Sequence, residues 1–152
     1  MQATTILIAG TPEAIETARY ALGGNFSYHL AHTVDQAISL VSPDIDLILC
    51  NVSFDESRML EFIRLAREAP ASRHIPIVCF RQHRRALKRS TYDAIEVVLG
   101  TYERTSFVDL YDVSQRGGLS NALLAFRAAV MKALAVETRI ASIPAAADPV
   151  SH

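Results

Sequence analysis

Short runs of consecutive hydrophobic residues alternate along the chain with longer segments in which hydrophobic residues recur every three or four positions. Three runs are almost uninterrupted: Ile6–Ala9, Leu47–Cys50 and Ile75–Phe80. Such runs are typical of strands buried on both faces of a sheet. In Phe26–His32 and Phe107–Tyr111 larger and smaller side chains alternate, which is typical of less buried edge strands. The pattern therefore predicts five strands.

Between and after these strands, five segments carry hydrophobic residues at helical spacing. They cover residues 12–22, 34–41, 57–69, 83–99 and 119–136. Thr11 is suited to cap the first helix, because Pro12 follows it at the first helical position. In the third helix Ile63 is expected to face inward, with Arg64 and Arg67 outside. Strands and helices alternate five times, which predicts an α/β fold with a parallel sheet and helices on both faces.

Length and composition favour one domain. The chain has 152 residues, half of them hydrophobic, and a formal net charge of −1. We expect one domain over residues 1–136 and an unstructured tail rich in Ala and Pro over residues 137–152. A charge near zero argues against nucleic acid or anionic lipid as a partner of the whole surface. No apolar run approaches the roughly 20 residues of a membrane span, and the start lacks a secretory signal, so we expect a cytoplasmic protein.

Two segments resemble a known family. Pro43–Ser53, followed by a Leu-rich helix, is similar to the third strand of response-regulator receiver domains, and His74–Val78 is similar to their fourth strand, where an Ile-Pro-Ile start is common. The number and order of elements agree from about Thr4 to Leu134. The resemblance implies a flavodoxin-like, doubly wound five-stranded parallel sheet with strand order 2-1-3-4-5, and places the second and fifth strands on the edges.

The resemblance also implies where phosphotransfer chemistry would lie. A receiver needs a carboxylate to accept the phosphoryl group, an acidic pair to hold Mg²⁺, and a hydroxyl and a lysine to bind the phosphoryl oxygens. These positions fall here on Asn51, on Gly10 and Thr11, on Arg81, and on Leu110. An amide is neutral and a poor nucleophile. We therefore predict a degenerate pseudo-receiver that is not an enzyme and has no metal site or cofactor.

The densest cluster of charge follows the fourth strand, at the sheet edge where ligands of doubly wound folds usually bind. Its candidate ligand-binding residues are Arg81, His83, Arg84, Arg85, Lys88 and Arg89. They suit an anion, a nucleotide, nucleic acid or an acidic partner surface. The structural interpretation is a solvated helix start balanced by Asp93 and Glu96. Because the segment lacks interleaved aromatic residues, nucleic acid is the less favoured ligand.

The preferred hypothesis is a phosphorylation-independent signalling module that binds another protein. The resemblance implies docking, or a homodimer, through the face of the fourth helix, fifth strand and fifth helix. Tyr102 and Tyr111 are the candidate contact residues there, with core packing as the alternative. An anion- or nucleotide-binding module built on residues 81–89 is the main rival. A redox pair of Cys50 and Cys79 is a third hypothesis, although thiols in apolar strands are usually inert.

Overall fold

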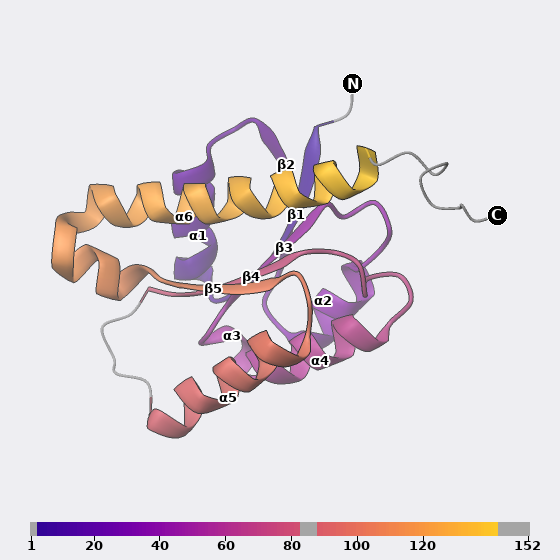
Figure 1. The fold of residues 1–152 in the computed structure, drawn as a ribbon, viewed down its shortest axis with the longest axis horizontal. Coiled ribbons are helices and arrows are strands. Elements are labelled where there is room, and N and C mark those ends of the chain that lie inside the picture. The colour runs from indigo at the N-terminus through magenta and orange to yellow at the C-terminus, as the bar shows by residue number, and fades with distance from the viewer. Residues whose placement is uncertain (1–2, 83–87, 143–152) are drawn as a thin grey trace.

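The computed structural model describes residues 3–82 and 88–142, with the side chains of 136–142 left aside. Its centre is a parallel sheet of strand order β2-β1-β3-β4-β5 (Figure 1). The strands are β1 (Thr4–Ala9), β2 (Phe26–Ala31), β3 (Leu47–Asn51), β4 (Ile77–Arg81) and β5 (Thr105–Asp109). The predicted flavodoxin-like topology is confirmed, and the two alternating segments do lie on the edges of the sheet.

Helices cover both faces of the sheet. They are α1 (Pro12–Leu22), α2 (Val34–Leu40), α3 (Phe54–Ser57), α4 (Met59–Glu68), α5 (Arg89–Thr101) and α6 (Leu110–Ser142). The first core layer lies between the sheet and α2, α4 and α5; the second lies between the sheet and α1 and α6 (Figure 1). In β3, Ile48 packs into the first layer and Leu49 into the second. Both faces of this strand are therefore buried, which explains its uninterrupted hydrophobic run.

Strand β5 and the helix after it differ from the prediction. The strand ends at Asp109, two positions before the predicted end at Tyr111. The Asp109 carboxylate accepts a hydrogen bond from the Asp112 backbone N–H (3.0 Å), as the cap of a helix does. Helix α6 therefore begins at Leu110, well before the predicted start, and bends at Gly118, whose φ of 88° suits glycine. Its backbone stays helical over 137–142, part of the predicted tail, and 143–152 lie outside the described residues.

Two other helix starts also differ from the prediction. Helix α5 starts at Arg89, after Lys88 in an extended conformation, and residues 83–87 lie outside the described part of the chain. Ser57, the predicted start of the third helix, is the last residue of the separate turn α3, and α4 begins at Met59. In α3, Asp55, Glu56 and Ser57 all have positive φ, which ends the short turn before α4 begins.

Helix α6 is unusually apolar. By length and composition alone, Leu110–Ala135 could cross a membrane, although polar residues interrupt its apolar positions throughout. In the fold, Phe126 and Val130 on this helix are fully buried in the second core layer. Leu124 and Met131 are 62% and 50% exposed. The helix therefore packs on the sheet through one side and presents an apolar surface on the other.

Candidate functional site

Asn51 ends β3 at the carboxyl edge of the sheet and is 1% exposed. Its side-chain oxygen accepts a hydrogen bond from the Ser53 backbone N–H (3.1 Å), and its Nδ2 donates to the Phe80 carbonyl (3.5 Å). The neutral amide side chain therefore both accepts and donates a hydrogen bond inside the core. A carboxylate at this position would face the Phe80 carbonyl oxygen without a proton to donate.

Gly10 and Thr11 lie beside Asn51 at the end of β1. A Cβ atom on Gly10 would be 3.3 Å from the Cβ atoms of both Asn51 and Ala14, so even a small side chain is crowded there. The Thr11 hydroxyl accepts a hydrogen bond from the Ala14 N–H (3.2 Å) and caps α1, as the sequence predicts. The two positions serve close packing and helix capping.

The carboxylates of Asp55 and Asp46 are both occupied by other contacts. Asp55 accepts a hydrogen bond from the Val34 N–H (2.8 Å) and pairs with Arg58 (3.0 Å). Asp46 accepts a hydrogen bond from the Thr5 N–H (2.8 Å) at the opposite, amino-terminal end of the strands. Within the described residues, no group of three or more His, Cys, Asp and Glu side chains could hold a metal ion.

Arg81 and Asp109 join the ends of β4 and β5. The two residues are register partners in the sheet, and Arg81 Nε lies 3.0 Å from Asp109 Oδ1. The Tyr92 hydroxyl of α5 donates to Asp109 Oδ2 (3.3 Å), and the Arg81 guanidinium lies 5.0 Å from the centre of the Tyr111 ring. Arg81 is only 8% exposed. One ion pair thus connects β4, β5, α5 and α6.

Leu110, predicted at the lysine position, is 4% exposed and packs in the second core layer. The residue opposite Arg81 is Asp109. Asp109 was not among the predicted site residues, because the predicted strand ended two positions too late. Tyr92 was missed with it, since its contact here is with Asp109. Correct strand register was the signal that would have identified Asp109.

Arg81, Lys88 and Arg89 are the described basic residues of the segment 81–89, and their surroundings differ. Lys88 is exposed at the start of α5, and the highly exposed Arg89 side chain lies 3.5 Å from Asp93. Arg81 is buried against Asp109. His83, Arg84 and Arg85 lie outside the described residues, so an anion site on this segment stays a prediction.

Tyr102 and Tyr111 are both half-buried. Tyr102 packs against the first core layer, and Tyr111 lies under the Arg81 guanidinium. Each ring therefore contributes to packing while part of it reaches the surface. Their role as contact residues stays a prediction.

Cys50 and Cys79 are register partners on β3 and β4, and both thiols are free and buried. Burial raises the pKa of Cys50 well above its usual value, and raises that of Cys79 to about 12. Since the thiolate is the reactive form, both groups should be poor nucleophiles in the folded protein.

We expect iodoacetamide at pH 8 to alkylate the folded protein roughly a thousandfold more slowly than the unfolded chain, because few thiolates form. The unfolded chain loses these thiol protons at a lower pH than the folded protein does. Folding stability should therefore fall as the pH rises above the ordinary thiol pKa of 9.0. Alkylation rates followed by intact mass check the first expectation. Rapid alkylation of the native protein would revive the redox hypothesis.

The sequence matches no protein-family model and no curated protein. Solved structures do match its fold. A putative response regulator from Chloroflexus aurantiacus is 14% identical, with a TM-score of 0.66 over 88% of this chain and 99% of that chain. The phosphorylated cyanobacterial phytochrome response regulator RcpA is 12% identical, with a TM-score of 0.64 over 84% and 91%. The chemotaxis response regulator CheY4 of Vibrio cholerae is 11% identical, with a TM-score of 0.57 over 85% and 99%. The predicted receiver-like fold is confirmed.

Proposed function

We propose that the chain is a phosphorylation-independent, receiver-like signalling module of the cytoplasm, which is not an enzyme and acts by binding another protein. The observation that carries this proposal is Asn51 at the end of β3, buried and hydrogen-bonded through both its oxygen and its nitrogen. In the receiver domains that the fold resembles, this end of the sheet is where a carboxylate accepts the phosphoryl group. The amide has no ionised oxygen with which to attack phosphorus.

The Arg81–Asp109 ion pair supports the same proposal. By the resemblance, the ends of β4 and β5 are where a receiver holds the oxygens of its phosphoryl group. Here a cation and an anion at these two ends satisfy each other at 3.0 Å, with Tyr92 as a further donor. The two strand ends are joined without an added phosphoryl group, and we infer that the domain keeps one arrangement of α5 against β5.

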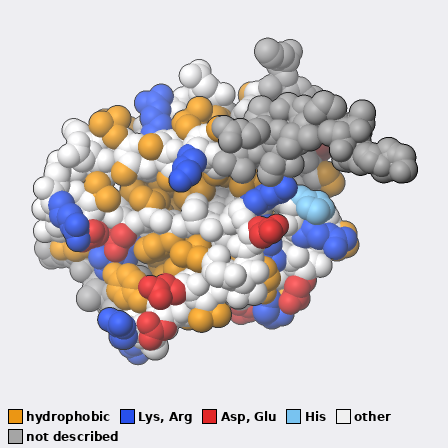
Figure 2. All heavy atoms as spheres, viewed as in Figure 1, with side chains coloured by type: hydrophobic (Ala, Val, Ile, Leu, Met, Phe, Trp, Pro, Cys, Tyr) orange, Lys and Arg blue, Asp and Glu red, His pale blue; other side chains and the backbone are white. Residues whose placement is uncertain are grey.

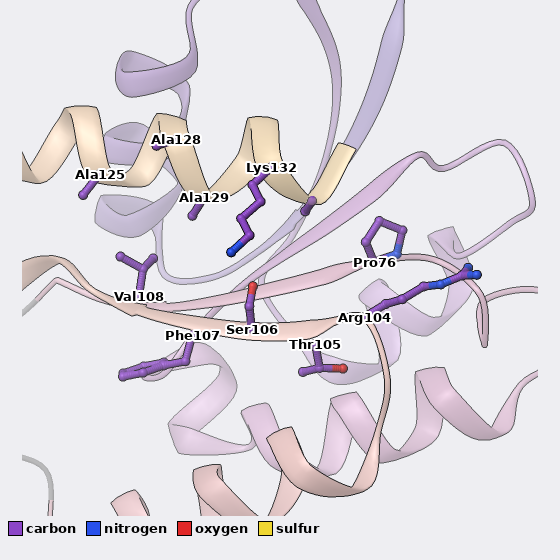
Figure 3. Close-up of a pocket in the computed structure, with 11 residues that line it drawn as sticks. Pro76, Arg104, Thr105, Ser106, Phe107, Val108, Ala125, Ala128, Ala129 and Lys132 are labelled. Atoms are coloured by element: carbon purple, nitrogen blue, oxygen red, sulfur yellow. The ribbon is translucent and has the colours of Figure 1, made fainter. Parts of the chain in front are cut away.

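The face made by α5, β5 and α6 supplies the proposed docking surface. A groove of about 570 Å³ runs between β5 and α6, with Ala125, Ala128 and Ala129 on the helix side (Figure 3). Lys132 and Arg104 also line it. β5 is an edge strand, so its outer backbone groups have no partner strand. Figure 2 shows hydrophobic side chains gathered on this face of the molecule.

We expect Ala128→Glu combined with Leu124→Glu to weaken partner binding by about tenfold or more, because the two carboxylates lose solvation against an apolar partner. Both residues are exposed on α6, so folding should be unaffected. Tyr20→Glu, at a 77% exposed position on α1, is the matched control. Cross-linked capture from lysate with all three proteins, and sedimentation of each for self-association, provide the measurement. Docking on this face would be refuted if the Ala128→Glu, Leu124→Glu variant still captured the partner. It would also be refuted if the Tyr20→Glu control lost the partner equally.

A further inference from the structure

A second cavity lies at the other end of the sheet, beside the amino-terminal ends of β4 and β5. Its volume is about 280 Å³. Four segments contribute to it: the end of α4, the loop before β4, the end of α5 and the loop before β5. The lining consists of Arg67, Arg73, His74, Thr101, Tyr102, Glu103 and Arg104. With three arginines against a single glutamate, this cavity is positively charged at neutral pH.

One residue that lines the cavity, Arg67, is a buried cation, and no carboxylate of the described residues pairs with it. Arg67 is 9% exposed, although the helical pattern predicted it on the outside of α4. Its Nη1 donates to the carbonyl of Ile75 (2.6 Å), and its Nη2 donates to the carbonyl of Arg104 (2.9 Å) and the hydroxyl of Thr105 (3.1 Å). Each of these acceptors is neutral, and the buried Nε has no hydrogen-bond partner in the described part of the chain. Burial and the neighbouring Arg104 lower the pKa of Arg67, as expected when no anion balances the charge.

Two further hydrogen-bond donors line the same cavity, and no described residue accepts a hydrogen bond from them. In the described part of the chain, neither the Arg73 guanidinium nor the Tyr102 hydroxyl makes a hydrogen bond or ion pair. Among the described residues, the Glu103 carboxylate likewise has no basic partner. It is the one group of the lining that opposes a bound anion. A guanidinium and a hydroxyl beside a buried positive charge suit the charge and the hydrogen-bond acceptors of an oxyanion.

We propose that this cavity binds a small oxyanion, the phosphate or carboxylate group of a small molecule. Arg73 and Tyr102 would donate hydrogen bonds to it, and Arg67 supplies a charge whose effect is strengthened by its burial. Thirteen-residue helix α5 ends at the cavity, while its other end carries Tyr92 near Asp109. The site is thus separate from Asn51 and does not depend on the proposed docking role.

The test is thermal unfolding of the purified protein in inorganic phosphate, pyrophosphate or succinate, with chloride at equal ionic strength as the reference. A ligand that binds only the folded state raises Tm with its concentration. We expect a rise with at least one of the three anions. Comparison of the phosphates with succinate identifies which oxyanion the cavity takes. We expect Arg73→Gln with Tyr102→Phe to weaken that binding by about tenfold or more, measured by calorimetric titration.

Two controls make the result decisive. Arg64→Gln removes an exposed arginine from the same helix, and should leave the anion effect unchanged. Lys88→Gln with Arg89→Gln removes charge from the basic segment at the opposite edge of the sheet, and should also leave it unchanged. The proposal would be overturned if no anion raised Tm above its value in chloride. It would also be overturned if the rise persisted in the Arg73→Gln, Tyr102→Phe variant. A rise lost only with Lys88 and Arg89 would move the site to the basic segment.

Discussion

Replacing Asp109 by alanine is expected to lower the free energy of unfolding by about 3 kcal/mol, because it removes the anion paired with a buried guanidinium. Asp109 also accepts the Tyr92 hydroxyl and caps α6 through the Asp112 N–H. Three stabilising contacts are therefore lost together. Asp109→Asn keeps an oxygen for the cap and for Arg81 but removes the charge, and should cost about half as much. Urea unfolding of the two variants measures both values.

Asp93→Ala is the matched control, since it breaks a second Arg–Asp pair. That pair lies at 3.5 Å with both side chains well exposed, so its loss should change stability by no more than about 0.5 kcal/mol. If Asp109→Ala were as mild as Asp93→Ala, the ion pair would not be what joins β4 to β5. The inference that the domain keeps one arrangement without phosphate would then lose its main support.

Arg67→Met should be at least as damaging, at about 3–5 kcal/mol. The methionine fills much of the same space but has no donors, so the carbonyls of Ile75 and Arg104 lose their hydrogen bonds inside the protein. Those carbonyls lie just before β4 and β5. We expect a lower urea midpoint together with faster hydrogen exchange of the amides in both strands.

Arg64→Met is the control for this change, one turn earlier on α4. Arg64 is 53% exposed and its contact with Glu68 is 3.3 Å, so the substitution should cost less than about 0.5 kcal/mol. Equal effects of the two substitutions would show that the buried contacts of Arg67 contribute little. Arg67→Lys, which keeps the charge but not the planar fork, should fall between them.

Hydrophobic periodicity was sufficient to predict most of the fold. The continuous runs of β1, β3 and β4 are buried on both faces, so their pattern follows directly from their surroundings. The boundary between β5 and α6 could not be predicted from hydrophobic periodicity. Leu110 continues the run of apolar residues, but it packs into the core from the first turn of α6. The Asp109 cap, which sets that boundary, depends on a hydrogen bond that hydrophobic pattern does not report.

The site was predicted in part. Asn51, Gly10, Thr11 and Arg81 all lie at the carboxyl edge of the sheet, as parallel topology requires. Asp109 was missed with the strand end. Arg67 was missed because a charged residue was expected on the outside of the helix. It lies four residues after Ile63, on the same buried face of α4. Burial of a cation among carbonyl groups depends on loops that are distant in sequence.

The most direct measurement is the intact mass of the protein after incubation with Mg²⁺ and acetyl phosphate. A receiver domain that retains its acceptor aspartate serves as the positive control. We expect no phosphoryl adduct on this chain, because β3 ends in a buried, hydrogen-bonded amide in place of an ionised nucleophile. A Mg²⁺-dependent gain of one phosphoryl group would contradict the account.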